Sequence, residues 1–495
     1  MMDQEKLKRQ IGQRICAGFT GTEVTDEIRD LIREWKVGNI LLFSRNVVSY
    51  PQLKQLCADL DALIREETGV PPLIMIDEES GAVSRLGHLA GETPSAGAIG
   101  ATDRPENARA IGALIGRRLR AVGINMSLSP VLDCLTQPKN RVMGNRCFAP
   151  EPEKVARFGR AYIEGLHEAG ILTCGKHFPG HGDTATDSHF ALPTIEKPLS
   201  ALEQTELVSF RATIEAGTDA MMSAHIRFPA LDDAPATISA KILNGLLREK
   251  LGFRGLIISD GMEMKAMLDM FPIPEGVLLA LKAGVDIALV CHEPPEAAAS
   301  CLRAMEAALA GEMTEETLES HDRRIREAKT RLQPATGSEA DFLSAEGREM
   351  SRKMMAEAVK LIHRPDGKPL PEITEQTGFF GCVSRRGTPA AEEKHLNAAE
   401  VCARHFGARL IASEATEIPA GTGTLVGFLE TGDTTETDLR RIRQWAKEGK
   451  KIIAVALDVP AVLGECPDTV WKISAWQYQQ LAVETVIGML EKERT

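Results

Sequence analysis

Aromatic residues are scarce in this chain of 495 residues. It contains 15 Phe, 3 Tyr and 4 Trp, about 4% of the sequence. So few rings make a long polymer-binding cleft lined by stacked aromatic side chains hard to assemble, whereas a small polar pocket is easier to build. An excess of basic residues is also missing, because 58 Lys and Arg against 70 Asp and Glu give a net charge of −12. This charge argues against a nucleic-acid-binding protein.

Closely spaced cysteine pairs and long apolar runs are absent as well. Ten cysteines are spread along the chain and none has C-x-x-C spacing, so we expect neither a zinc ribbon nor a redox motif. Most lie among apolar neighbours and are interpreted as reduced thiols, which predicts a cytoplasmic protein. No run of 18 apolar residues occurs, and the charged N-terminal segment lacks the apolar stretch of a signal peptide. We therefore expect no transmembrane helix and no contact with a membrane.

What the sequence does contain is a rhythm of short apolar runs, each followed by a helical pattern. The runs are continuous rather than alternating, as in parallel strands that are buried on both faces. They lie at residues 14–19, 37–43, 72–77, 124–130, 171–175, 220–225, 255–260 and 285–290. Eight strand–helix repeats predict an α/β protein with an N-terminal (β/α)8 barrel of the TIM type. A doubly wound sheet is the alternative.

A second, smaller unit follows the barrel. Residues 314–360 are charged and strongly helical, and further apolar runs lie at 377–383, 408–412, 424–429 and 451–457. These runs and the helical patterns between them predict a smaller α/β sandwich domain. It contains no catalytic constellation in the sequence, so we expect a structural or dimer-forming role. We expect the barrel domain over 1–338, a helical linker over 339–371 that ends in a connecting loop (361–371), and the α/β domain over 372–495.

Polar residues cluster where the predicted strands end. Four of the apolar runs end in or are directly followed by Asp77, Lys176, His177, His225 and Asp260. Catalytic residues of barrel enzymes gather at the carboxyl ends of several strands, whereas an open sheet places its ligands at one switch point. The distribution therefore favours the barrel.

The densest polar stretch is Cys-Gly-Lys-His-Phe-Pro-Gly-His-Gly-Asp-Thr-Ala-Thr-Asp-Ser-His-Phe-Ala-Leu-Pro at 174–193. Its glycines and prolines prevent a continuous helix and predict a loop that leaves a strand end. Asp187 stands two residues before His189, a spacing at which a carboxylate can orient an imidazole and stabilise its protonated form. The alternative interpretation is an Asx-turn beside a solvated histidine.

Neither a metal nor a cofactor is expected. His177 and His181 are four residues apart, but zinc-binding histidines at this spacing need a helix, and the intervening Phe-Pro-Gly breaks one.

Asp260 and Asp77 each close an apolar run, where a carboxylate can serve as nucleophile, base or merely a helix N-cap.

In chain order, these segments resemble glycoside hydrolase family 3, and within it the bacterial β-N-acetylglucosaminidases. The matching segments are residues 37–46, 77–85 (similar to the motif D-x-E-G-G-x-V-x-R), 125–133, 144–148, 176–193, 224–232, 235–239 and 246–264. The stretch 176–193 is very close to the signature of the N-acetylglucosaminidase branch. The chain departs from the family at Ser80, where Gly is usual, at Cys147, where Ser is usual, and at Gly261, where Asp or Ala is more common.

The resemblance implies a retaining mechanism. Asp260 would be the nucleophile that forms a covalent glycosyl–enzyme, and His189, supported by Asp187, would be the general acid/base. The hydroxyl groups of the terminal sugar would be held by Asp77, Arg85, Arg146, Lys176 and His177.

The activity implied is that of an exo-acting β-N-acetylglucosaminidase, whose partner is a small glycan or muropeptide with terminal N-acetylglucosamine. Because a neutral imidazole repels an incoming anion less than a carboxylate does, phosphate is an alternative acceptor and phosphorolysis an alternative reaction. A β-glucosidase of the same family and a barrel aldolase with a Schiff base on Lys176 are further alternatives. The chain could also pair as a homodimer.

Overall fold

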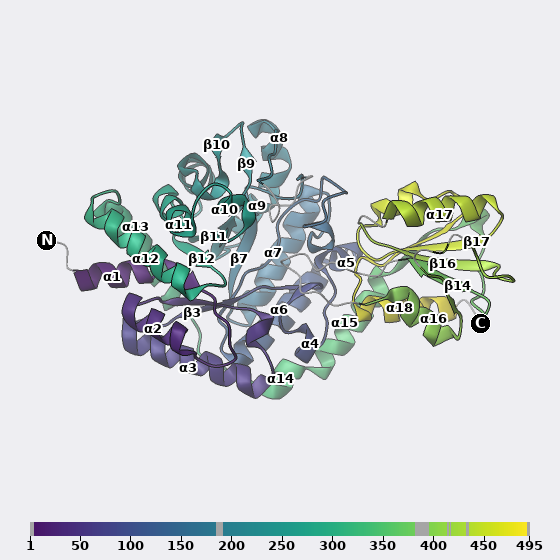
Figure 1. The fold of residues 1–495 in the computed structure, drawn as a ribbon, viewed down its shortest axis with the longest axis horizontal. Coiled ribbons are helices and arrows are strands. Elements are labelled where there is room, and N and C mark those ends of the chain that lie inside the picture. Colours follow the sequence, from purple (N-terminus) through teal and green to yellow (C-terminus); the bar gives the residue numbers. More distant parts are fainter. Residues whose placement is uncertain are drawn as a thin grey trace.

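The computed structural model describes residues 4–184, 192–381, 396–412, 415, 417–431 and 435–492. Its N-terminal part is a closed parallel barrel, and its C-terminal part is a separate six-stranded sheet with helices on both faces (Figure 1). The predicted (β/α)8 barrel and the smaller α/β domain are therefore confirmed. The closure of the barrel excludes the doubly wound alternative.

All eight apolar runs of the first part form barrel strands. The strands are β1 (Ile15–Ala17), β2 (Asn39–Leu42), β3 (Leu73–Ile76), β6 (Met126–Ser127), β7 (Leu172–Phe178), β8 (Ala220–Ser223), β11 (Leu256–Gly261) and β12 (Ile287–Val290). Each pairs in parallel with the next barrel strand along the chain, and β12 returns to β1. The carboxyl ends of all eight strands therefore open on one face.

Side chains alternate between the barrel interior and the layer of helices. In β3, Leu73 and Met75 belong to the interior cluster, whereas Ile74 and Ile76 pack towards the helices. The same alternation recurs in β11 and β12. Because both faces of each strand contact apolar groups, the strands correspond to continuous hydrophobic runs in the sequence.

Helices surround the barrel and fill the connections between its strands. They are α1 (Gln4–Gly12), α2 (Asp26–Trp35), α3 (Tyr50–Thr68), α4 (Gly87–Ala90), α5 (Ala96–Ala101), α6 (Pro105–Val122), α7 (Pro152–Glu168), α8 (Leu199–Gln204), α9 (Glu206–Glu215), η4 (Lys241–Lys250), α10 (Lys265–Leu268), α11 (Ile273–Ala283), α12 (Pro294–Leu309) and α13 (Glu315–Thr330). Two hairpins, β4 (Glu78–Ser80) with β5 (Val83–Ser84) and β9 (Arg227–Phe228) with β10 (Asp232–Pro235), extend the loops. Within the described ranges, no helix has both the length and the apolar character needed to cross a membrane.

The second sheet has the strand order β13–β18–β17–β16–β14–β15. Its strands are β13 (Lys360–His363), β14 (Gly378–Gly381), β15 (Arg409–Leu410), β16 (Thr424–Leu429), β17 (Lys451–Ala456) and β18 (Trp471–Ser474), and its helices are α16 (Ala398–Phe406), α17 (Thr435–Lys447) and α18 (Gln480–Lys492). β13 pairs antiparallel with β18, and the other pairs are parallel. Two of these strands, β13 and β18, were not predicted from the sequence. β13 begins just before the predicted connecting loop (361–371) and occupies its first residues.

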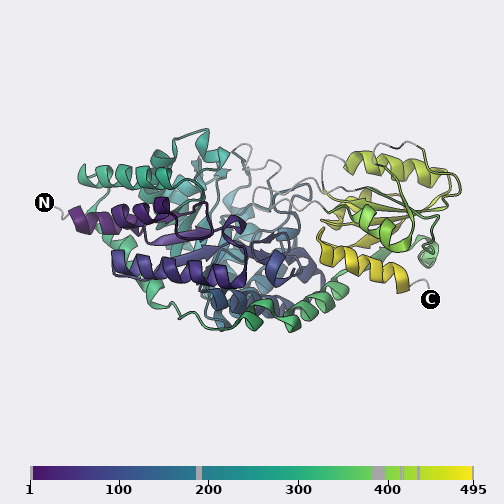
Figure 2. The same cartoon turned by 60° about the horizontal axis from the view of Figure 1, so that its bottom comes forward.

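Two helices, α14 (Glu339–Leu343) and α15 (Ala345–Ala358), connect the parts and run along one side of the molecule (Figure 2). α15 contacts α5 and α6 of the barrel part and α18 of the second part. Ala98 of α5 joins Met355 and Ala475 in one apolar cluster. The second domain is thus packed on the barrel rather than attached by the linker alone.

Candidate active site

The carboxyl face of the barrel brings the predicted sugar-holding residues together. Asp77 follows β3, and Asp260 is the last residue but one of β11. The sequence suggested that Lys176 and His177 follow their strand. They lie inside β7 instead, because β7 continues to Phe178 beside β8.

Five charged side chains form a line of ion pairs at this face. Arg146 donates from Nε and Nη2 to the two carboxylate oxygens of Glu79, both at 2.8 Å. Lys176 Nζ lies 2.5 Å from Glu79 Oε1 and 2.7 Å from Asp77 Oδ1. Arg85 Nη2 follows, 3.6 Å from Asp77 Oδ2. The signs alternate along the line, so each buried charge has an opposite neighbour.

Solvent reaches this line of ion pairs mainly at Asp77. Its side chain is 18% exposed, whereas Lys176 and Arg85 are 2% and 3% exposed and Arg146 and Glu79 are 8% and 4% exposed. The Asp77 carboxylate is therefore the group of the five best placed to accept hydrogen bonds from ligand hydroxyls. The others hold it in position.

The ion pairs fix the protonation states of the two central groups. Burial alone would raise the pKa of Glu79, but Arg146 and Lys176 outweigh it and hold this pKa well below the ordinary value. Burial alone would lower the pKa of Lys176, but Asp77 and Glu79 outweigh it and raise this pKa. At neutral pH both groups are charged.

A second carboxylate, Asp133, orients the histidines that follow in and after β7. His177 donates to its Oδ2 from the backbone N–H at 3.1 Å and from Nδ1 at 2.8 Å. The His181 N–H donates to Oδ1 at 2.6 Å. Burial and the neighbouring His177 lower the pKa of His181 to about 4, so this ring is neutral at pH 7. His177 is left with Nε2 as the ring atom available to a ligand.

Asp260 is partly exposed and is held by the backbone of its own strand. Its Oδ1 accepts the Gly261 N–H at 2.8 Å. The Gly261 carbonyl oxygen lies 3.0 Å from Nε2 of the buried His225, whose Nδ1 is 2.8 Å from Thr237 Oγ1. This arrangement fixes the orientation of a carboxylate that can attack an electrophilic carbon or accept a proton.

The two partly exposed carboxylates, Asp77 and Asp260, border the same interior region of the barrel. Burial raises the pKa of the Cys174 and Cys291 thiols, and the negative charges of both Asp77 and Asp260 raise each of them further. Since Asp77 follows β3 and Asp260 lies at the end of β11 in one closed parallel barrel, both carboxylates stand at the same barrel mouth.

Asp187 and His189 lie outside the described residues. The part of their loop before residue 185 is tied to the segment after β6. Asn140 Nδ2 donates to the His181 carbonyl oxygen at 2.9 Å and to Thr184 Oγ1 at 3.0 Å. At Gly182 a Cβ would lie 1.7 Å from the Cys134 carbonyl oxygen, so only glycine permits this approach.

Three residues of this site were given no role from the sequence. Glu79 lies inside the motif at 77–85, Asp133 ends the segment 125–133 and His225 ends the run at 220–225. Each had a visible signal, a polar group at or just after the end of an apolar run. Their roles were missed because they bind other side chains or the backbone.

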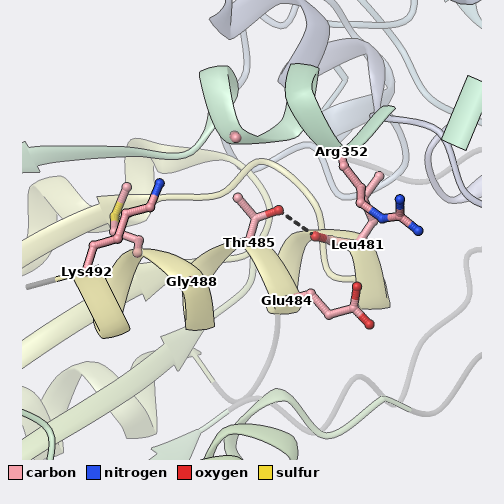
Figure 3. Close-up of a pocket in the computed structure, with 8 residues that line it drawn as sticks. Arg352, Leu481, Glu484, Thr485, Gly488 and Lys492 are labelled. Atoms are coloured by element: carbon pink, nitrogen blue, oxygen red, sulfur yellow. Dashed lines mark hydrogen bonds between the residues drawn. The ribbon is translucent and has the colours of Figure 1, made fainter. Parts of the chain in front are cut away.

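Other features of the described residues offer no competing site. No group of three or more His, Cys, Asp or Glu side chains there is placed to hold a metal ion. A cavity of about 340 Å³ lies between α15 and α18, with Arg352, Glu484 and Lys492 at its wall (Figure 3). It contains none of the predicted site residues.

Known proteins share the sequence pattern and the fold of this chain. Residues 5–328 match the model of the glycosyl hydrolase family 3 N-terminal domain. A β-hexosaminidase from Alkalilimnicola ehrlichii is 39% identical over 295 residues, which cover 58% of this chain and 83% of that protein.

Solved structures extend the likeness. A glycoside hydrolase family 3 β-N-acetylglucosaminidase from Paenibacillus sp. has a TM-score of 0.89 and 31% identity, and the match covers 98% of this chain and 97% of that one. NagZ from Neisseria gonorrhoeae, in complex with N-trifluoroacetyl-D-glucosamine, has a TM-score of 0.54 and 32% identity over 64% of this chain and 98% of its own. The resemblance seen in the motifs is confirmed: the chain belongs to glycosyl hydrolase family 3 and is a glycoside hydrolase.

Proposed function

We propose that this enzyme is an exo-acting, retaining β-N-acetylglucosaminidase that cleaves terminal β-linked N-acetylglucosamine from small glycans or muropeptides. The observation that carries the proposal is the presence of two differently held carboxylates at one barrel mouth. Asp77 is the most exposed member of a line of ion pairs and is suited to hydroxyl groups, and Asp260 is oriented by the Gly261 N–H. The β-hexosaminidase and β-N-acetylglucosaminidase relatives support an N-acetylated sugar.

In the proposed mechanism, the Asp260 carboxylate attacks the anomeric carbon and forms a covalent glycosyl–enzyme. His189 gives its proton to the departing oxygen, then takes a proton from the water that hydrolyses the intermediate. Imidazole has an ordinary pKa of about 6.5, so one ring can perform both steps without the raised pKa that a carboxylic acid would need. Asp187 favours the protonated ring before the first step.

The sugar-holding roles are proposed for Asp77, Arg85, Arg146, Lys176 and His177. Asp77 accepts hydrogen bonds from hydroxyls, Lys176 offers donors next to it, and His177 presents its Nε2. The ion pairs and the Asp133 hydrogen bonds keep these long side chains in place before the sugar arrives, which lowers the entropy lost on binding.

The protonation of Lys176 argues against the aldolase alternative. A Schiff base needs a neutral amine, and lysines that form one have a lowered pKa. The carboxylates of Asp77 and Glu79 raise the pKa of Lys176 instead. Phosphate as acceptor, the homodimer and the cytoplasmic location stay predictions.

Release of nitrophenol from a nitrophenyl β-N-acetylglucosaminide tests the proposal. We expect turnover by the wild type, and rates at least about 100-fold lower for Asp260→Asn and His189→Ala, since each loses a reacting group. Asp269→Asn is the matched control, because Asp269 is an exposed aspartate that pairs with Lys265 after the same strand. No release by the wild type, or an unaffected His189→Ala, would defeat the proposal.

Product analysis separates the remaining alternatives. Hydrolysis predicts free N-acetylglucosamine at a rate independent of phosphate, whereas phosphorolysis predicts the sugar 1-phosphate and a rate that rises with phosphate. Faster release from the nitrophenyl β-glucoside would instead favour the glucosidase.

A further inference from the structure

The turn at residues 140–147 carries Arg146 into the site. Asn140 Oδ1 accepts the N–H groups of Val142 and Met143 at 3.1 and 3.0 Å, and its carbonyl oxygen accepts the Gly144 N–H at 3.0 Å. Gly144–Arg146 then forms a single 3₁₀ turn, η2. The Arg146 guanidinium leaves this turn for Glu79. The position of the turn therefore sets the position of Arg146.

One backbone donor of the turn is bound from the second domain. The N–H groups of Gly144 and Arg146 donate within the turn, to Asn140 and Met143. The Asn145 N–H donates instead to Oδ1 of Asp458, at 3.1 Å. Asp458 lies two residues beyond β17, at the carboxyl edge of the second sheet. It accepts one of the donors that a first helical turn leaves without an internal partner.

Two further observations show that this contact is close packed. Gly144 has a φ of +36°, and a Cβ on it would lie 3.0 Å from Asp458 Oδ1, tighter than most real Cβ contacts. Val459, the next residue, packs in one apolar cluster with Val142, Met143 and Cys147. The edge of the second sheet thus meets the turn through a hydrogen bond and an apolar contact.

We propose that Asp458 is a positioning residue of the active site. By holding the Asn145 N–H, it fixes the turn that carries Arg146, and through Arg146 it fixes Glu79, Lys176 and Asp77. The second domain then helps to shape the sugar pocket without touching the sugar. This inference rests on the proposed function, because it takes Arg146 and Asp77 as groups of the sugar-binding site.

The domain interface offers a matched control. Glu92 Oε2 accepts the Leu481 N–H at 2.9 Å, so here too a carboxylate binds a backbone donor across the two domains. Glu92 lies outside the turn and supports none of its donors. Loss of Glu92 reports on domain attachment in general, whereas loss of Asp458 reports on the turn.

Kinetics on the nitrophenyl β-N-acetylglucosaminide at pH 8 test the proposal in the full chain. Burial raises the pKa of Asp458 to about 6, so the group is ionised at this pH. We expect Asp458→Ala to raise KM about five- to tenfold with kcat within about twofold, because ground-state sugar binding is lost. Asp458→Asn keeps an acceptor oxygen and should restore KM to within about threefold, and Glu92→Ala should leave both constants within about twofold. An unchanged KM in Asp458→Ala, or an equal rise in Glu92→Ala, overturns the proposal.

Amide hydrogen exchange at Asn145 gives a second measurement that needs no substrate. Exchange should be at least about tenfold faster in Asp458→Ala and unchanged in Glu92→Ala. If Asp458→Ala does not fold, Gly144→Ala replaces it, since its methyl group presses on the same contact from the barrel side. Unchanged exchange overturns the inference. A wild type inactive on the glycoside defeats the proposed function instead, and exchange still decides whether Asp458 holds the turn.

Discussion

Glu79 shows how one buried carboxylate can hold several charged side chains of a site. It lies within hydrogen-bond distance of both Arg146 and Lys176. We expect Glu79→Gln to leave two buried cations without their shared counter-charge and to lower the free energy of unfolding by about 3 kcal/mol. Urea denaturation at pH 7 measures this loss. Glu67→Gln, which breaks partly exposed pairs with Lys36 and Arg33, should cost at most about 1 kcal/mol, and a similar cost for both would contradict the argument.

The lowered pKa of Glu79 predicts how the difference in stability between the wild type and Glu79→Gln depends on pH. Because Arg146 and Lys176 hold the pKa of Glu79 below its ordinary value, its contribution is fully present above about pH 4.3 and is lost only as pH falls through the lower pKa of the folded state. The stability gap between wild type and Glu79→Gln should therefore stay constant from pH 5 to 8. Denaturation curves that converge between pH 6 and 5 would contradict this assignment.

At the residue scale, the sequence predicted the sugar-holding side chains better than it predicted the side chains that hold them in place. Asp77, Lys176 and His177 were expected at strand ends and do meet at one mouth. Glu79 and Asp133 were given no role because their partners come from distant segments. Arg146 is 67 residues from Glu79, and His177 is 44 from Asp133. No local pattern specifies such a pair, so only the fold reveals it.

At the scale of elements, burial decided which strands could be predicted. The barrel strands are apolar on both faces and gave continuous runs in the sequence. β13 was missed because its residues alternate between exposed and partly buried positions, as on a sheet edge. β18 is buried, but its Lys472 and Ser474 interrupt the apolar pattern. Polar side chains in a sequence are expected to face solvent, but tertiary contacts bury both Lys472 and Ser474.

One element, α13, carries a buried cation far from the site-bearing loops. Lys329 donates to Gln13 Oε1 at 2.5 Å and to the Gly38 carbonyl oxygen at 3.0 Å, and burial lowers its pKa to about 7. The unfolded chain, with an ordinary pKa near 10.4, binds the proton more tightly, so stability should rise with pH between about 7 and 10. Lys329→Met should remove this rise in the free energy of unfolding, which amounts to a few kcal/mol between pH 7 and 9. Denaturation curves at pH 7, 8 and 9 measure it. Lys282→Met, at a surface pair, should leave it unchanged.

At the scale of the whole molecule, we propose the boundaries that the sequence suggested: the barrel over 1–338, the linker over 339–371 and the α/β domain over 372–495, with β13 as a strand that the linker adds to the second sheet. The sequence could not predict how the two domains meet. Their contacts join residues more than 300 positions apart, as between Ser95 and Gln477 or Asn145 and Asp458. No pattern in the sequence marks these two surfaces as partners, and Ala98, buried at the interface, has the sequence context of an ordinary helical alanine.

A fragment that ends at residue 338 tests this arrangement. NagZ from Neisseria gonorrhoeae is matched over 98% of its length by 64% of this chain, so a chain close to the size of the barrel part can form a complete structure. We expect the fragment to fold with a cooperative thermal transition but to bind the nitrophenyl glycoside with a KM at least about fivefold higher, since the Asn145 N–H loses Asp458. Adding Asp458→Ala to the full chain should reproduce most of that rise. A folded fragment with the KM of the full chain would show that the second domain leaves the sugar pocket unaffected.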